Sequence, residues 1–269
     1  MNQLQLRHVS GRRLSSLLAE VADTPFRFSD EQRDALAARF RAVPTTQHRR
    51  LDAWSVEQGG AEPTPFAWSP SNARRSLGRS ALAAVHVGRS PSLAVAVRQE
   101  IERVSDRALS PSIPSGSLAV WLVHQRPAVR AIVAAEAVTW ATETLECFDD
   151  LLVDWEALGS DAYYDVAGAR TSLRGRREAL VNAPTGRVLV RVRSGAPGAS
   201  AGAGLRADLV TDALANPLGV AALRIVGLWP DAGIALAVDG TEGNVKRGAR
   251  GLVRAASVRQ GATTQRRAS

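Results

Sequence analysis

The arginines of residues 174–193 are the side chains whose type and spacing suggest chemistry most directly. The strand arginines, as we call them, are Arg174, Arg176, Arg177, Arg187, Arg191 and Arg193. In RVLVRVR, alternation places the valines on one face of a strand and Arg187, Arg191 and Arg193 on the other. Guanidinium groups bind phosphates through paired hydrogen bonds, so the strand arginines are candidates for a nucleic-acid-binding ribbon. The alternative is an edge hairpin that its charges protect against aggregation.

All the charged side chains of residues 131–169 are carboxylates, because the segment contains no lysine or arginine. Glu143, Glu146, Asp150 and Asp154 are spaced to lie on one side of a helix. Di-metal carboxylate bundles use such helices, but they also contain a Glu-x-x-His motif, which is absent from this chain. We therefore expect no metal site. The acidic side is interpreted as a solvated face, or as a contact for a basic region of the same chain or of a partner.

Motifs for zinc chemistry or for a P-loop are absent from the sequence. The histidines His8, His48, His86 and His124 are far apart, and GK[ST] does not occur. Cys147 is the single cysteine, which excludes an internal disulfide and fits a reducing cytoplasm. Its apolar and acidic surroundings indicate a small buried residue.

Composition indicates a globular protein with affinity for polyanions. The chain has 269 residues, 45% of them hydrophobic, which is enough for a packed core. No apolar run approaches the length needed to cross a bilayer, so no membrane association is expected. The net charge of +8 makes attraction to nucleic acid plausible on electrostatic grounds.

Helix signals dominate the first part of the sequence. Ser29 and Gln32 have capping-box spacing, and Ser69–Pro70 and Ser90–Pro91 each predict a helix start. A long helix is predicted from Pro127 to Leu158, and its acidic side covers residues 136–156.

Strand signals dominate the second half. The segments TSLRGRREALV and RVLVRVR, the helix LRADLVTDALA, the strands ALRIVGLW and GIALAV, and a final helix follow in that order. This order predicts an α/β (α+β) fold with a mixed central sheet flanked by helices. We expect an N-terminal helical region and linker over 1–66, an α/β domain over 67–258, and a basic disordered tail over 259–269.

The order of these elements resembles the core of the PD-(D/E)XK nuclease superfamily, particularly its RecB-like exonuclease domains. In that family a helix precedes three strands, the second strand carries an aspartate, and the third carries the (D/E)XK triplet. Here LRGRREALVN and VLVRVRSGAP occupy those two strands. The resemblance places Glu178 or its neighbour at the aspartate position, Arg191 at the acid position and Arg193 at the lysine position.

The family's chemistry implies two carboxylates that hold magnesium and a lysine that helps to activate water. Arg191 would repel the metal, and arginine is too strongly protonated to act as a base. We therefore expect a catalytically degenerate nuclease-fold protein that binds DNA, or a DNA-processing partner, without cleavage and without a cofactor. The strand arginines would be its binding surface.

Two other functions stay open at this stage. One is a non-catalytic interaction or structural protein that binds a basic partner through the acidic helix 136–156. The other is an active magnesium-dependent exonuclease or endonuclease with migrated ligands, for which Glu178 is the catalytic candidate.

Overall fold

The chain forms two compact units in a computed structural model of the whole chain. The structure describes residues 2–5, 17–18, 24–45, 47–59, 67–110, 112–114, 116–148, 154–158, 161–183 and 186–265. One unit contains Met1–Pro63 and Leu151–Ser269, and the other contains Thr64–Asp150. Residues 64–150 thus form a unit of their own, whereas the sequence placed 67–258 in one domain.

The unit Thr64–Asp150 is helical in its described part. It contains α4 (Pro70–His86), α5 (Leu93–Arg107), α6 (Leu118–Val123) and α7 (Pro127–Glu146). Helix α4 begins as predicted, with Pro70 first and the Ser69 hydroxyl accepting a hydrogen bond from the Asn72 amide. The predicted start of α5 at Ser90–Pro91 is wrong. The Ser92 hydroxyl accepts from the Val95 amide instead, so the helix begins at Leu93.

The acidic helix 136–156 is also wrong as a single element. Helix α7 ends at Glu146, and Trp155–Ala157 form strand β3 of the other unit, paired with β6 (Ala179–Ala183). The prediction extended the helix too far because apolar residues continue after Glu146 in the sequence. Trp155 and Ala157 are at least partly buried, but as residues of a strand. Glu143 and Glu146 therefore share no helix face with Asp154, and Asp150 lies outside the described residues.

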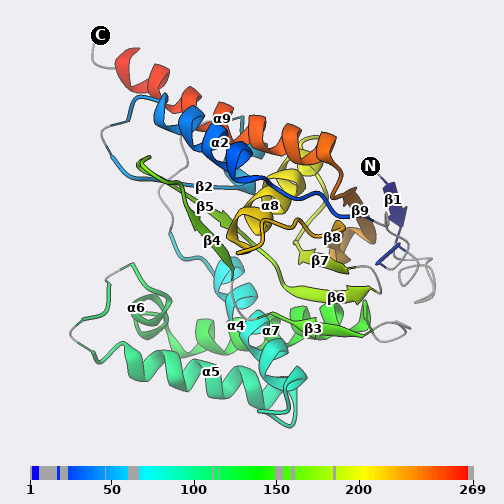
Figure 1. Cartoon of the computed structure of the whole chain (residues 1–269). Coiled ribbons are helices and arrows are strands. Elements are labelled where there is room, and N and C mark those ends of the chain that lie inside the picture. The colour runs from blue at the N-terminus through cyan, green and yellow to red at the C-terminus, as the bar shows by residue number, and fades with distance from the viewer. Residues whose placement is uncertain are drawn as a thin grey trace. The chain divides into compact units, whose positions relative to one another are not determined.

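The other unit is a mixed α/β structure, as predicted. Its remaining elements are β1 (Asn2–Gln5), α2 (Asp30–Arg41), β2 (Arg49–Asp52), α3 (Ala53–Glu57), β4 (Ala162–Asp165), β5 (Thr171–Gly175), β7 (Gly186–Val192), α8 (Ala201–Ala215), β8 (Arg224–Trp229), η2 (Pro230–Ala232), β9 (Ile234–Asp239) and α9 (Glu242–Gln265). Six strands pair in the order β1-β9-β8-β7-β6-β3, and three pair in the order β2-β5-β4. In the larger sheet only β7 and β8 are parallel, and α8 connects them (Figure 1).

The segment TSLRGRREALV is two strands rather than one, because β5 and β6 belong to different sheets. The chain turns at Gly175–Arg177, where it passes close to α8. A Cβ at Gly175 would lie 3.2 Å from Thr211 Cβ, and the Arg176 amide donates to Asp208 Oδ1 at 3.2 Å. Alternation in the sequence cannot show such a change of sheet. The predicted hairpin of β6 and β7 is confirmed.

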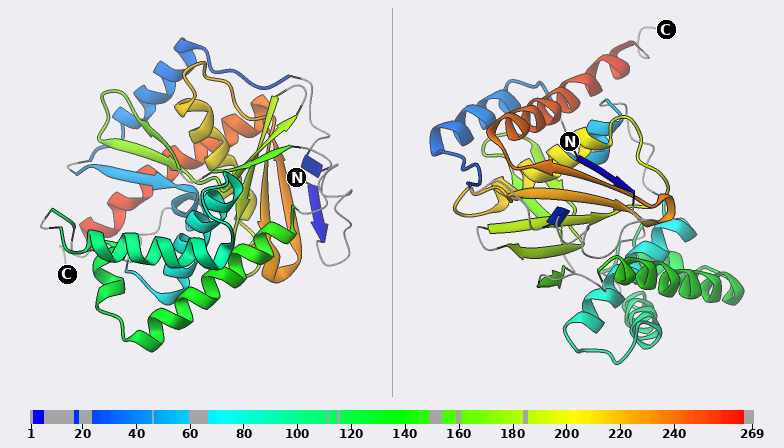
Figure 2. Two further views of the ribbon diagram at one scale, coloured as in Figure 1. Left: turned by 90° about the horizontal axis from the view of Figure 1, so that it is seen from below. Right: turned by 90° about the vertical axis from the view of Figure 1, so that its right-hand side faces the viewer.

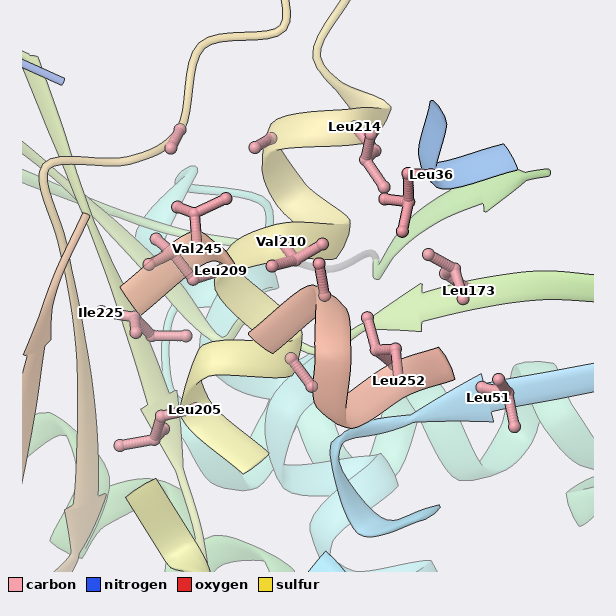
Figure 3. Packing of buried hydrophobic residues seen from close by; sticks show 14 of the residues in the cluster. Leu36, Leu51, Leu173, Leu205, Leu209, Val210, Leu214, Ile225, Val245 and Leu252 are labelled. Atoms are coloured by element: carbon pink, nitrogen blue, oxygen red, sulfur yellow. The ribbon is translucent and has the colours of Figure 1, made fainter. Parts of the chain in front are cut away.

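Helix α8 is the centre of this unit. It packs against α3, α9 and strands of both sheets, and most of its residues are buried. Figure 3 shows four of them, Leu205, Leu209, Val210 and Leu214, with apolar side chains of α2, β2, β5, β8 and α9. A helix that is apolar on most sides is expected in such a buried position.

The ends of the chain differ from the prediction in two ways. The helical region expected over 1–66 contains two strands, β1 and β2, of which β2 pairs in parallel with β5. Helix α9 continues to Gln265, into the tail expected to be disordered from residue 259. Among the helices of the described residues, none has the length and apolar character required of a membrane span.

Candidate functional site

Two buried carboxylates of α8 form ion pairs with three of the strand arginines. Asp208 and Asp212 are each 2% exposed, and they lie one helical turn apart. Burial of a carboxylate is costly unless hydrogen bonds and an opposite charge compensate for the lost water. Both acids therefore need cationic partners, and the strands beside α8 supply them.

Asp208 is paired with Arg191 of β7. The Arg191 Nη1 donates to Asp208 Oδ2, and the Arg176 backbone amide donates to Oδ1. The Arg191 side chain is only 8% exposed. Burial, and after it repulsion from the nearby Arg193, lowers the pKa of this guanidinium to about 10. Arg191 thus stays charged at neutral pH, in a buried ion pair.

Asp212 is held by two arginines, Arg177 from the turn between β5 and β6 and Arg187 from β7. Arg177 Nη1 donates to Oδ1 at 2.9 Å, and Arg187 Nη2 donates to Oδ2 at 2.7 Å. Burial raises the pKa of the Asp212 carboxyl, while the two guanidiniums oppose that rise. Arg191 follows Arg187 in β7, whereas its partner Asp208 precedes Asp212 in α8. This order arises because α8 runs antiparallel to β7.

Arg193 and Arg174 have carboxylate partners outside α8. Arg193 forms a two-point contact with Glu57, in which Nη2 lies 2.6 Å from Oε2, and its Cζ lies 5.4 Å from the centre of the Trp229 ring. A Cβ at residue 204 would overlap the Glu57 carboxylate, so a larger residue there would displace Glu57 from its contact with Arg193. Arg174 Nε donates to Asp161 Oδ2 at 2.6 Å.

Arg176 differs from the other strand arginines. Among the described residues its guanidinium forms no ion pair. Its pKa is lowered, mainly by burial and to a smaller extent by repulsion from Arg174. The strand arginines therefore do not form an open cationic row. Five of the six are matched by carboxylates of the same unit. The edge-hairpin interpretation is wrong as well, since β6 and β7 lie inside the sheet.

Glu178 lies beside this cluster and is 7% exposed. Its Oε2 accepts a hydrogen bond from the Val192 amide at 2.9 Å, and its charge acts on Arg191. The structure therefore brings together the positions 178, 191 and 193 that the nuclease resemblance identifies. Arg191 and Arg193 form ion pairs with carboxylates, and Glu178 accepts a backbone hydrogen bond. Within the described residues, no group of three His, Cys, Asp or Glu side chains is placed to hold a metal.

Cys147 offers no reactive nucleophile. Its Sγ donates to the Glu143 carbonyl at 3.2 Å, and burial raises the pKa of the thiol to about 11, with further contributions from Glu146 and Glu143. We expect iodoacetamide to alkylate it about 100-fold more slowly at pH 8 than an ordinary thiol, because the thiolate is so scarce. Mass spectrometry over time measures the rate, and the urea-unfolded chain is the control. Equal rates in the two states would contradict this assignment.

Sequence reasoning missed the acidic partners Glu57, Asp208 and Asp212. A signal for two of them exists: LRADLVTDALA places two acids four residues apart in a largely apolar helix. Glu57 lay in the expected linker, and only the fold brings it to Arg193.

Helix α9 presents a different set of cations. Lys246, Arg247, Arg250 and Arg254 are exposed, and no Asp or Glu follows Glu242 in the sequence. Lys246 forms an ion pair with Glu242 at 2.6 Å, in which both side chains are largely exposed. Arg250 and Arg254 form no ion pair with any described residue. We call these four residues the α9 basic face.

No protein-family model matches this chain, and no curated protein matches it.

Proposed function

We propose that this protein is a cytoplasmic, non-catalytic nucleic-acid-binding protein whose contact surface is the α9 basic face. The observation that carries the proposal is the exposure of these cations on a helix with no acid after its first residue. Lys246, Arg250 and Arg254 recur every fourth residue, so they follow one side of the helix about 6 Å apart. Phosphate contacts of this kind position a protein on nucleic acid without reading its sequence.

The non-catalytic part of the proposal rests on the cluster around Arg191. A magnesium ion at the position of Arg191 and Arg193 would meet two positive charges, and the carboxylates nearby already bind guanidiniums. The nuclease-like ancestry remains part of this proposal. It is supported by the element order and by the convergence of residues 178, 191 and 193.

The proposal predicts salt-dependent binding of a labelled DNA duplex. Replacing Arg250 and Arg254 by glutamine should weaken binding, because two phosphate contacts are lost. Each contact contributes about −0.9 to the slope of log K against log salt, so the slope should become shallower by about 2. Fluorescence anisotropy over a sodium chloride series measures it.

The matched control is Arg98→Gln with Arg107→Gln on α5, which removes the same charge from exposed positions of another helix. Its slope should equal that of the unaltered protein. A lack of DNA affinity at low salt, or an equal loss in both double variants, would contradict the proposal. Magnesium-dependent degradation of the duplex would contradict its non-catalytic part.

A further inference from the structure

A pocket of about 310 Å³ lies between α2 and α9 in the unit that contains both sheets. The two helices lie side by side in Figure 1 and in the right-hand view of Figure 2. The lining residues are Phe26, Phe28, Gln32, Ala35, Leu36, Arg39, Val245, Lys246, Ala249 and Arg250. Its volume is at the lower end of the range for small-molecule sites.

The interior of the pocket is apolar. Phe26 and Phe28 meet edge to face with ring centres 5.0 Å apart, and leucine, valine and alanine side chains complete the wall. The one uncharged polar side chain in the lining, Gln32, is already engaged, because its Oε1 accepts from the Ser29 amide at 3.0 Å. A ligand that fills this space therefore needs a body of hydrocarbon.

The charged residues of the lining are all cations. Arg39, Lys246 and Arg250 are exposed, and no Asp or Glu lines the pocket. Arg39 and Arg250 have no ion pair with any described residue, and Lys246 shares only a solvent-exposed pair with Glu242. An apolar pocket with unmatched positive charge is complementary to a molecule that joins a hydrocarbon body to one anionic group.

We propose that this pocket binds a free medium-chain fatty acid, with the acyl chain inside and the carboxylate on Arg39 and Arg250. A nucleobase fits less well, because its polar edge would meet hydrocarbon without hydrogen-bond partners. A membrane surface fits less well too. None of the lining residues is among the exposed large apolar side chains of the described part, which an inserting surface requires.

The test uses decanoate as the probe, measured by isothermal titration calorimetry, and 1-decanol as its uncharged analogue. We expect decanoate to bind at least about tenfold more tightly than 1-decanol, since a charge-assisted hydrogen bond contributes at least that factor. Arg39→Gln should remove most of this difference while leaving 1-decanol binding unchanged. Arg39 lies outside the α9 basic face, so the result does not depend on the proposed function.

A second variant fills the cavity. Ala35 lines the pocket and is exposed, so Ala35→Trp adds volume there without disturbing the core; decanoate affinity should fall at least about tenfold. The control is Ala38→Trp, at an exposed position of the same helix but outside the lining. Neither variant should change DNA affinity. Equal decanoate affinity of the two tryptophan variants, equal binding of decanoate and 1-decanol, or binding only to anionic phospholipid vesicles would each overturn the inference.

Discussion

Replacing Asp208 by alanine is expected to lower the free energy of unfolding by about 3–5 kcal/mol, because it leaves the Arg191 charge buried without its partner. The Arg191 side chain extends from β7 to α8 and is 8% exposed, so water cannot replace the lost carboxylate. The substitution also removes the acceptor of the Arg176 amide. Urea denaturation followed by circular dichroism measures the change.

Two controls separate the ion pair from the general effect of removing a carboxylate. Asp34→Ala removes an exposed acid of α2 and should change stability by no more than about 0.5 kcal/mol. The double variant Arg191→Met with Asp208→Leu should lose less stability than Asp208→Ala alone, since no unpaired charge remains in the core. If Asp208→Ala behaved like Asp34→Ala, the pair would be structurally unimportant.

The chain has a net charge of +8, yet few of its strand arginines are available to a ligand. The distribution of the acidic residues explains why. Five of the six strand arginines are matched by acids of α3, α8 and the segment before β4, whereas the cations of α9 have almost no acids near them in the sequence. Net charge therefore does not show where on the chain a polyanion would bind. The proposed surface is on α9, because its cations are exposed and have almost no acids near them in the sequence.

Local signals in the sequence were enough for much of the fold. The capping box of Ser29 and Gln32 starts α2, the Ser69–Pro70 pair starts α4, and the apolar runs at β7, β8 and β9 became strands. These features depend on interactions within a few residues, so their sequence patterns are sufficient.

The errors share one cause, which is contact between distant segments. Strand β3 has three residues and pairs only with β6, and β2 joins β5 from more than 100 positions earlier in the chain. Arg193 meets Glu57 across 136 residues. No local pattern contains such pairings. The outward face of RVLVRVR was assigned correctly as opposite to the valines, but α8 covers that face as well.

The second large effect concerns the contact between α8 and α9, which fixes the α9 basic face on the core. Gly248→Ala is expected to destabilise the protein by about 1–3 kcal/mol, as overpacking does. A Cβ at Gly248 would lie 2.4 Å from the Arg206 carbonyl oxygen and 2.8 Å from Val210 Cγ2. The nearest atom belongs to the backbone of a buried helix, so it cannot move aside without shifting α8.

Helix propensity alone predicts the opposite sign for this substitution, because alanine is favoured over glycine in helices by about 1 kcal/mol. Gly243→Ala in the same helix is the matched control. A Cβ there meets only Arg247 Nη2, at 3.7 Å, so this variant should be neutral or slightly more stable. Thermal unfolding of both variants distinguishes the two effects. A gain in stability for Gly248→Ala would show that α9 packs less closely on α8 than these distances require, and the position of the basic face would then have to be reconsidered.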